Sequence, residues 1–325
     1  MEEDIFQPRT DLSQLHDTVM RMRIEIGKVI VGQEDMVKLI VAALLADGHV
    51  LIEGVPGVAK TLTAKLVAKC ISLHFSRIQF TPDLMPSDVL GTSIFNPKEG
   101  GFQFKRGPIF GNIVLVDEIN RAPAKTQAAL FEVMEEKQVT VDGYSHIIER
   151  PFMVLATQNP VEQEGTYRLP EAQLDRFLFK ITVPYPTEEE EVQILNRFHN
   201  VTGEDITEQI KEMLTATDIS TLRKQVKEVL IEEKLLQFIA KIVTSTRSNK
   251  SIYLGASPRA SLAIMSSAKA IAAMQGRDFV TPEDVLEMAV PVLRHRIILT
   301  PEKEMEGGTE DDVIREIIQS LEIPR

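Results

Sequence analysis

The sequence predicts an α/β core built on a parallel sheet, followed by a second domain made of helices. Four short apolar runs alternate with amphipathic segments in the first part of the chain: His49–Ile52, Ile113–Val116, Phe152–Ala156 and Phe177–Val183. This alternation is typical of a parallel sheet covered by helices on both faces, an αβα sandwich. After Pro184-Tyr-Pro-Thr187 no strand pattern is visible, and signals for helix starts recur instead. We therefore expect a core domain at residues 1–186 and an all-helical domain at residues 187–325.

Apolar side chains at helical spacing predict the individual helices. A polar arm opens the chain, and mixed apolar periodicity follows up to residue 33. Residues 34–46 and 62–70 each carry one apolar helical face, and a third helix follows Glu118. In the second domain, three threonine–acid pairs are typical of helix N-termini. The pairs are Thr187 with Glu190, Thr281 with Asp284, and Thr309 with Asp312.

Composition and charge argue against several classes of protein. The 325 residues are 43% hydrophobic and 26% charged, the balance of a soluble globular chain. No apolar run approaches the ~18–20 residues of a membrane span, and the acidic N-terminus lacks the hydrophobic run of a secretory signal. A net charge of −12 and the absence of Trp argue against nucleic acid as the partner. We expect the partner to be a protein or a small molecule.

The single cysteine, Cys70, rules out an internal disulfide and a cysteine-ligated metal cluster. It lies in an apolar helical stretch, so we expect a buried and unreactive thiol. These features favour the cytoplasm as the compartment.

A glycine-rich segment between a strand and a helix predicts a phosphate-binding loop. The segment comprises Gly54, Val55, Pro56, Gly57, Val58, Ala59, Lys60, Thr61 and Leu62. Glycines let the backbone curl so that its N–H groups point at phosphate oxygens, helped by the N-terminus of the helix. Lys60 would place a cation against the β- and γ-phosphates of ATP, and Thr61 would offer its hydroxyl to Mg²⁺. The alternative is an ordinary strand–turn–helix with a surface lysine.

One position departs from the usual pattern of this loop, because the residue before the lysine is Ala59 rather than glycine. Alanine adopts a positive φ only at a cost in free energy. We therefore expect Ala59 to lie in the first turn of the helix, where a Cβ is tolerated.

Two acids end the second apolar strand. Asp117, at the tip of the strand, is suited to hold Mg²⁺ together with Thr61. Glu118 follows it in the chain and points in a different direction, so it is suited to polarise a water for attack on the γ-phosphate. The alternative is a pair of solvated charges after a strand.

Three further polar residues stand where strands or helices begin and end. Asn159 follows the run Phe152–Ala156 and could steady the attacking water or sense the γ-phosphate, although Asn-Pro is also a common turn. Arg176 comes just before the last core strand, and Arg259 lies in the first turn of a helix in the second domain. Taken alone, each arginine would be interpreted as part of a surface salt bridge.

Together these segments resemble the MoxR family of the AAA+ superfamily. The motifs that carry the resemblance are GVPGVAKT, LVDEINRAPAKTQAALFEVMEE, ATQNP and LPEAQLDRF, and the similarity extends from about Val31 to Arg296. The resemblance implies an AAA+ core with a helical lid domain. It also implies that Asn159 is the sensor-1 residue, Arg259 the sensor-2 arginine that reports nucleotide from the lid, and Arg176 the arginine finger that reaches the ATP of a neighbouring subunit.

Other expectations follow from the same resemblance. A finger supplied by a neighbour requires assembly, and the class usually forms a hexameric ring. Arg168 stands where members of the family often have proline, so it gets no shared role, although it competes with Arg176 for the finger. The run Arg294-His295-Arg296 also recurs in the family and is left without a role.

Two segments interrupt the core. Residues 82–108 are rich in Gly and Pro breaks, contain Phe95, Phe102 and Phe104, and resemble a loop-rich insertion into the second core helix. Residues 137–150 contain an Asp142-Gly143 turn between β-prone runs, which predicts a hairpin. Such elements often face the pore of the ring or a partner; the alternative is a stabilising flap that contacts nothing.

The resemblance implies an ATPase that remodels or activates other proteins, together with a partner that carries a von Willebrand A domain. A DNA-directed motor is one alternative, although no winged-helix pattern or basic run supports it. A scaffold that cycles slowly and acts by being ATP- or ADP-bound is the other, and the complete set of Glu118, Asn159 and Arg176 argues against it.

Overall fold

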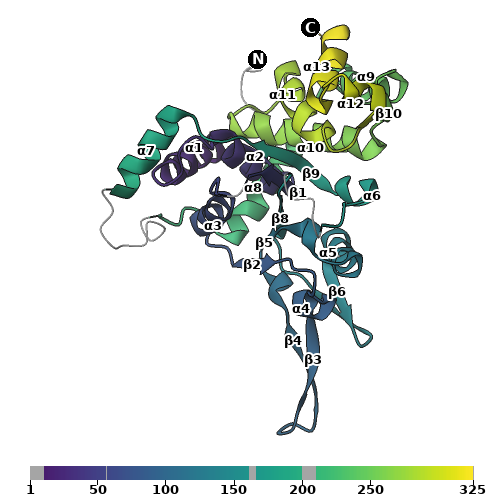
Figure 1. Ribbon diagram of the computed structural model, residues 1–325. Helices are drawn as coiled ribbons and strands as arrows, with labels where there is room; N and C mark the ends of the chain where they lie inside the picture. Colours follow the sequence, from purple (N-terminus) through teal and green to yellow (C-terminus); the bar gives the residue numbers. More distant parts are fainter. Residues whose placement is uncertain (1–10, 56, 161–165, 200–209, 325) are drawn as a thin grey trace, which may run out of the picture.

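The computed structural model describes residues 11–55, 57–160, 166–199 and 210–324 (Figure 1). At its centre lies a parallel sheet of five strands in the order β2-β5-β8-β1-β9. The strands are β1 (His49–Gly54), β2 (Phe75–Gln79), β5 (Ile113–Asp117), β8 (Met153–Gln158) and β9 (Phe177–Val183). The expected parallel α/β core is therefore confirmed.

Helices cover both faces of this sheet, and this explains why its inner strands are apolar at nearly every position. Val50 and Ile52 of β1 belong to a buried cluster with α1, α2 and α3, whereas Leu51 between them belongs to a second cluster with α5. Alternate side chains of a strand point to opposite faces, so a strand buried on both faces needs apolar residues throughout. The helices of the core are α1 (Ser13–Gly27), α2 (Glu34–Leu45), α3 (Lys60–Cys70), α4 (Pro86–Leu90), α5 (Ala124–Glu136) and α6 (Glu171–Leu174), with 3₁₀ turns at Pro108–Phe110 and Ile119–Arg121.

The strand β2 is the one member of the sheet that the apolar runs do not indicate. It lies at the edge beside β5, and of its five residues only Ile78 is buried. An edge strand has one side open to solvent, so polar residues such as Arg77 and Gln79 are tolerated there.

The chain after residue 187 is largely helical. Its elements are α7 (Glu188–His199), α8 (Ala216–Glu228), α9 (Glu233–Ser248), β10 (Ile252–Leu254), α10 (Pro258–Met274), α11 (Pro282–Leu293), β11 (Ile298–Leu299), α12 (Pro301–Met305) and α13 (Glu310–Ser320). The threonine–acid caps at Thr187, Thr281 and Thr309 are confirmed. The expectation that this part contains no strand is wrong, because β10 and β11 pair antiparallel. Strands of two or three residues are too short to show a period of two in the sequence.

These helices do not stand apart from the core. α10 packs against α2 and α1, and the buried side chains of both parts form one cluster. On α8, Arg223 donates hydrogen bonds to the Leu44 carbonyl at 2.8 Å and to Asp47 at 2.7 Å, just before β1 begins. Within the described residues, none of the helices combines the length and the apolar content that crossing a bilayer requires.

Two β-hairpins project from one end of the core in Figure 1. The hairpin β6 (Gln138–Val141) and β7 (Tyr144–Ile147) confirms the expected one, and its turn residues Asp142 and Gly143 have positive φ of 52° and 82°. The segment at 82–108 is not a set of loops as expected. It forms α4 and a second hairpin, β3 (Gly91–Asn96) with β4 (Gly101–Arg106), whose turn is longer and lacks an Asn-Gly or Asp-Gly signal.

Candidate functional site

The glycine-rich loop joins the end of β1 at Gly54 to the start of α3 at Lys60. The Lys60 Nζ donates a hydrogen bond to the Gly54 carbonyl at 2.5 Å, so its ammonium group lies over the loop. Burial lowers the pKa of Lys60, while the negative charges of Asp117, Glu118 and Glu53 oppose this shift. Lys60 begins the helix that follows β1, so its ammonium group lies at the same end of the sheet as both acids that end β5. Pro56 lies outside the described residues.

The expected conformation of Ala59 is wrong. Ala59 is the N-cap of α3 and has φ 57° and ψ 20°, the left-handed region, rather than a helical conformation in the first turn. An L-residue in this region costs about 1–2 kcal/mol. The neighbouring Gly57 also has positive φ, 89°, and no described atom lies within 4 Å of the place where its Cβ would be. The loop therefore makes two left-handed turns, and only one of them uses a glycine.

Asp117 is the last residue of β5, and its buried carboxylate has two partners. Arg77 Nε donates to Asp117 Oδ2 at 2.6 Å, and Thr157 Oγ1 donates to Asp117 Oδ1 at 3.1 Å. The sequence does not indicate Arg77, whereas Thr157 belongs to the polar run Thr157–Asn159 that ends the third apolar strand. The register of the strands explains both contacts: Arg77 pairs with Leu115, two residues before Asp117 and on the same face, and Ala156 pairs with Val116, so Thr157 stands beside Asp117.

Glu118 leaves the strand in a left-handed conformation, with φ 58°, and so points away from Asp117 as expected. Gln79 Nε2 donates to Glu118 Oε2 at 2.9 Å, and Arg121 Nε lies 3.1 Å from the same oxygen. The Glu118 N–H is bonded to Thr157 Oγ1 at 3.0 Å. The carboxylate is therefore held at the tip of the sheet by two side chains that sequence reasoning missed.

The donor set at this edge of the sheet suits a magnesium ion. Carboxylate and hydroxyl oxygens are the ligands that Mg²⁺ prefers, with further positions filled by water and phosphate. Each oxygen of Asp117 accepts one hydrogen bond in this structure and can accept a second interaction. Thr61 follows Lys60 at the start of α3. Among the described residues there is no cluster of three His, Cys, Asp or Glu side chains that could hold a metal.

Asn159 follows directly after β8 and is buried. Because β8 lies between β1 and β5, Asn159 emerges between the phosphate loop and Asp117. The fold therefore brings Lys60, Asp117, Glu118 and Asn159 to the carboxyl-terminal end of the sheet, as expected for residues that follow parallel strands.

A groove of about 760 Å³ is lined by Val183, the residue that pairs with Gly54 at the start of the glycine-rich loop. Val31 and Gly32 line it before α2, Val183 and Pro184 line it at the end of β9, and Pro291 lines it from α11. Val183 also packs closely on Gly54, since a Cβ on Gly54 would lie 2.9 Å from the Val183 carbonyl oxygen. The groove has the mixed apolar and polar lining that suits a nucleoside. The groove cannot be predicted from the sequence, because three segments far apart in the chain form its wall. These segments are residues 31–39, 181–184 and, in the lid, 287–294.

The two expected catalytic arginines lie at the opposite end of the sheet, where the strands begin. Arg176 precedes β9, whose first residue, Phe177, pairs with His49 at the start of β1. The six residues of β1 separate this amino-terminal end of the sheet from the phosphate loop by about 20 Å. Arg259 lies with Arg176, because both contact Glu135 near the end of α5. Neither arginine is placed beside the phosphate loop of its own chain.

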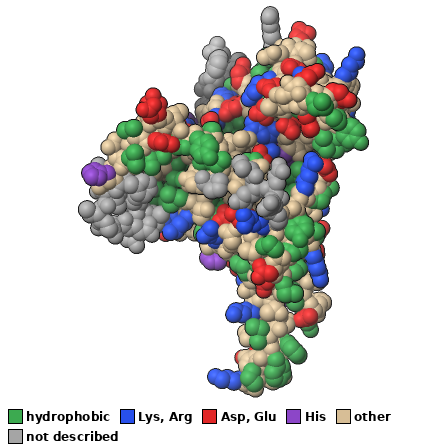
Figure 2. Space-filling view, viewed as in Figure 1, with side chains coloured by type: hydrophobic (Ala, Val, Ile, Leu, Met, Phe, Trp, Pro, Cys, Tyr) green, Lys and Arg blue, Asp and Glu red, His purple; other side chains and the backbone are tan. Residues whose placement is uncertain are grey.

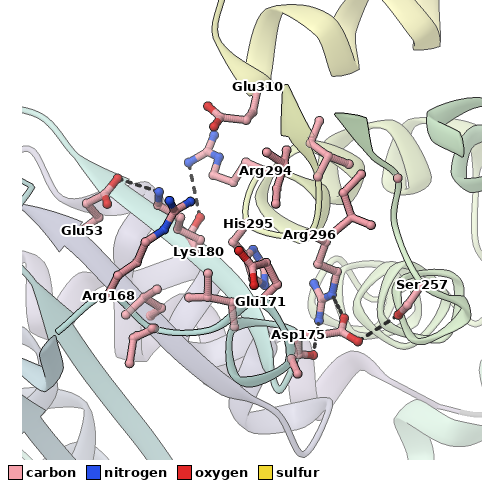
Figure 3. Close-up of a pocket in the computed structure, with 18 of the residues that line it drawn as sticks. Glu53, Arg168, Glu171, Asp175, Lys180, Ser257, Arg294, His295, Arg296 and Glu310 are labelled. Carbon is pink, nitrogen blue, oxygen red and sulfur yellow. Dashed lines mark hydrogen bonds and ion pairs between the residues drawn. The ribbon is translucent and has the colours of Figure 1, made fainter. Parts of the chain in front are cut away.

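The run Arg294-His295-Arg296 attaches the lid to β9 (Figure 3). Arg294 makes a two-point ion pair with Asp311, at 2.9 and 2.7 Å, and donates to Thr182 Oγ1 at 2.9 Å. His295 Nε2 lies 2.9 Å from the Phe177 carbonyl oxygen, and burial holds the pKa of this imidazole well below its ordinary value. The neutral form therefore donates to that oxygen.

The last residue of the run, Arg296, is almost completely buried. It donates to Asp175 Oδ1 at 2.7 Å and to carbonyl oxygens of Asp175, Phe177 and Leu178. The run is therefore a lid contact. This run also lines a cavity of about 390 Å³, and Arg168 lines the same cavity with its guanidinium group beside Lys180 (Figure 3). Arg176 and Arg259 do not line that cavity.

Comparison with known proteins agrees with this architecture. Residues 49–179 match the ATPase family associated with various cellular activities (AAA), and residues 244–317 match the AAA lid domain. The chain is 46% identical to the uncharacterized protein YeaC of Bacillus subtilis over 95% of its own length and 96% of that protein. It is 43% identical to Chaperone MoxR1 of Mycobacterium tuberculosis over 95% of its own length and 83% of that protein.

A solved structure has the same fold. A crystal structure described as that of a candidate ATPase from Cytophaga hutchinsonii superposes with a TM-score of 0.89, at 42% identity, over 97% of both chains. Proteins named MoxR from Methylorubrum extorquens and Paracoccus denitrificans are each 27% identical over at least 90% of this chain. With its parallel core, its glycine-rich loop after β1 and its helical lid, the chain belongs to the MoxR family of AAA+ ATPases.

Proposed function

We propose that this protein binds ATP with Mg²⁺ and hydrolyses it to ADP and phosphate. The observation that carries the proposal is the convergence of Lys60, Asp117, Glu118 and Asn159 at the carboxyl ends of three neighbouring strands. ATP would lie with its phosphates over the loop and its nucleoside in the groove beside Val31 and Pro184. Bound Mg²⁺ would neutralise phosphate charge, and Thr61 and Asp117 would hold it.

Glu118 is the residue that we propose as general base. Its carboxylate is fixed by Gln79 and Arg121, so it can accept a proton from a water in a defined position. Asn159 would orient that water, and Lys60 would stabilise charge on the γ-phosphate.

The first test is Lys60→Ala, measured as ATP affinity by calorimetry. Removal of the cation over the loop should abolish tight binding, whereas Lys65→Ala, on the same helix, should leave the affinity unchanged. Equal affinities for the two variants would contradict the assignment of the loop.

We further propose that hydrolysis occurs at subunit boundaries of a homo-hexameric ring. Arg176 and Arg259 lie about 20 Å from the phosphate loop of their own chain, so they could act only on the ATP of a neighbour. An arginine finger of this kind contributes about 10³–10⁵ in rate. Arg168 occupies the separate cavity beside Lys180, and Arg168→Ala should therefore keep most of the activity.

A mixing experiment tests the shared site. Arg176→Ala subunits lack the donated arginine, and Glu118→Gln subunits lack the base, so neither homo-oligomer should turn over ATP at more than about 1% of the normal rate. Mixed rings contain some boundaries with both groups intact, and their activity should reappear. Absence of rescue in mixed rings of verified composition would mean that Arg176 does not act across a boundary.

The work done by hydrolysis is proposed to be the remodelling or activation of a protein partner, one that carries a von Willebrand A domain. The two hairpins present apolar side chains to solvent: Phe102 is 78% exposed and Tyr144 is 74% exposed. Figure 2 shows apolar side chains at the lower end of the molecule, together with Lys and Arg. Exposed aromatic residues on a projecting element favour a contact with protein. The name of the relative Chaperone MoxR1 agrees with such a role.

Glu118→Gln also serves to identify the partner, since it should bind ATP and remain bound to its partner. Purification from source cells should recover a protein with a von Willebrand A domain. Replication or repair proteins that are lost on nuclease treatment would favour a DNA-directed motor instead. If Glu118→Gln supports partner activation as well as the natural chain does, a nucleotide-gated scaffold is the better description. A cytoplasmic location stays a prediction.

A further inference from the structure

One carboxylate joins the two arginines that we propose to act across the subunit boundary. Glu135 Oε2 lies 3.4 Å from Arg176 Nε, and Glu135 Oε1 lies 2.9 Å from Arg259 Nη2. Each arginine thus uses a different oxygen of the same group. All three side chains remain partly exposed, with 39% of the Glu135 side chain accessible, so the cluster faces outward.

The three residues come from three separate elements that meet at this edge. Glu135 lies near the end of α5, Arg176 precedes β9, and Arg259 is in the first turn of α10. Arg176 is fixed further by a hydrogen bond from Nη1 to the Phe131 carbonyl oxygen at 2.9 Å.

The backbone beneath the two arginines is also connected. Ser257 caps the start of α10, and its hydroxyl donates to Asp175 Oδ2 at 2.9 Å. Asp175 precedes Arg176 in the chain, so the segments that carry Arg176 and Arg259 are held together independently of Glu135. Loss of Glu135 would therefore release Arg259 and leave Arg176 only its bond to the Phe131 carbonyl oxygen, without separating the elements.

The carboxylate has a clear physical effect on this pair. Two guanidinium groups placed side by side repel each other, and each arginine side chain loses conformational entropy when it is fixed. A carboxylate that forms an ion pair with both groups offsets the repulsion and restrains both side chains before any phosphate arrives. The bond from Arg259 to Glu135 is also a charge-assisted hydrogen bond, which is stronger than a neutral one, and groups fixed in advance stabilise charge more effectively than mobile ones.

We propose that Glu135 is a positioning residue that presents Arg176 and Arg259 as one preformed pair to the ATP of the neighbouring subunit. The proposal rests on the proposed function, because it assigns these arginines to a shared site. It makes Glu135 part of the surface that a subunit contributes to its neighbour, and not part of the subunit's own nucleotide site.

Steady-state kinetics provides the first test. Glu135→Ala should lower kcat about tenfold while the KM for ATP and the ATP affinity stay within twofold of normal. The reason is that the phosphate loop of the same chain lies at the opposite end of the strands. Glu135→Gln keeps the length and one acceptor oxygen, so its kcat should be intermediate. The matched control is Glu136→Ala, which removes the adjacent exposed carboxylate of α5, a group with no ion pair among the described residues. Its kcat should be normal.

Mixing identifies the side of the boundary on which Glu135 acts. Glu135→Ala subunits mixed with Glu118→Gln subunits should regain activity, because some boundaries combine a normal pair of arginines with a normal base. Glu135→Ala mixed with Arg176→Ala should not regain activity, because both defects lie on the donating side. A residue with only a structural role would change the unfolding midpoint and would show no such selectivity.

The outcomes separate this inference from the proposed function. If Arg176→Ala and Arg259→Ala keep normal turnover, the shared site itself is wrong. If those two variants lose activity while both Glu135→Ala and Glu135→Gln behave like Glu136→Ala, Glu135 does not position them and the inference is overturned. If Glu135→Ala fails to fold, Glu135→Gln decides alone, and a normal kcat in it overturns the inference.

Discussion

Replacement of Arg296 by alanine should loosen the attachment of the lid to the core. Arg296 makes five hydrogen bonds, one to the Asp175 carboxylate and four to backbone carbonyl oxygens at the start of β9 and the end of α11. Its side chain is only 3% exposed, and that of Asp175 is 18% exposed. The substitution therefore removes a buried cation and leaves most of its acceptors without a donor.

The expected cost follows from these contacts. Removal of one partner of a buried ion pair costs about 3–5 kcal/mol, because the remaining charge is left in a poorly solvated place. Asp175 keeps its bond from the Ser257 hydroxyl and some access to solvent, so we expect the lower end, about 3 kcal/mol. The control is Arg315→Ala. Arg315 is 55% exposed and pairs with Asp311 at 3.4 Å, so its loss should cost less than about 1 kcal/mol.

Urea denaturation followed by circular dichroism measures the difference. Arg296→Ala should lower the midpoint by on the order of 1 M relative to the natural chain, and Arg315→Ala should leave it nearly unchanged. Arg296→Lys keeps the charge but cannot reach several acceptors at once, so it should recover only part of the loss. If Arg296→Ala and Arg315→Ala have the same midpoint, the buried arginine does not hold the lid, and the reasoning is refuted.

Three further predictions follow from the backbone and from burial. Ala59→Gly should leave ATP affinity and stability unchanged or slightly improved, whereas Ala59→Val should lower the free energy of unfolding by about 1–3 kcal/mol at this left-handed position. Denaturation midpoints report stability and calorimetry reports ATP affinity. Equal midpoints for the two variants would contradict the assigned φ. Burial lowers the pKa of His49 to about 4, and its Nδ1 accepts a bond from the Val154 N–H, so the neutral form is required. The unfolded chain binds this proton below about pH 6.5 and the folded chain only below about pH 4, so stability should fall by about 3 kcal/mol as the pH is lowered through this window. His49→Gln should flatten that part of the curve of unfolding free energy against pH, and an unchanged curve would show that other groups are responsible. Gly107→Ala should distort the base of the β3–β4 hairpin, because the new Cβ would lie 2.3 Å from the Val89 carbonyl oxygen. The expected readout is faster proteolysis of this hairpin than in Gly101→Ala, because a Cβ on Gly101 would meet no described atom within 4 Å.

Much of the architecture could be predicted from local pattern. The inner strands are buried on both faces, so each is a continuous apolar run that stands out from its surroundings. The helix caps at Thr281 and Thr309 depend on residues three positions apart, and they occur as expected. The hairpin with the Asp142-Gly143 turn was predictable for the same reason, since two adjacent residues determine its turn.

Elements governed by distant contacts were not predictable in this way. The edge strand β2 has a single buried residue, and β10 and β11 are too short to show a period. Ala59 adopts a left-handed conformation that its own propensity opposes, because the loop must turn between β1 and α3 at that point.

For the site, the sequence by itself determined which residues gather at the carboxyl ends of the strands, because the loop and the acids directly follow strands whose carboxyl ends meet at one end of the sheet. The sequence could not indicate their neighbours. Only the tertiary structure brings Gln79 to Glu118 and bonds Arg296 of the lid to Asp175 before β9. It also joins Arg176 to Arg259 through Glu135. Those contacts connect residues between about 40 and 120 positions apart, and their geometry depends on strand order and helix packing rather than on any local spacing in the chain.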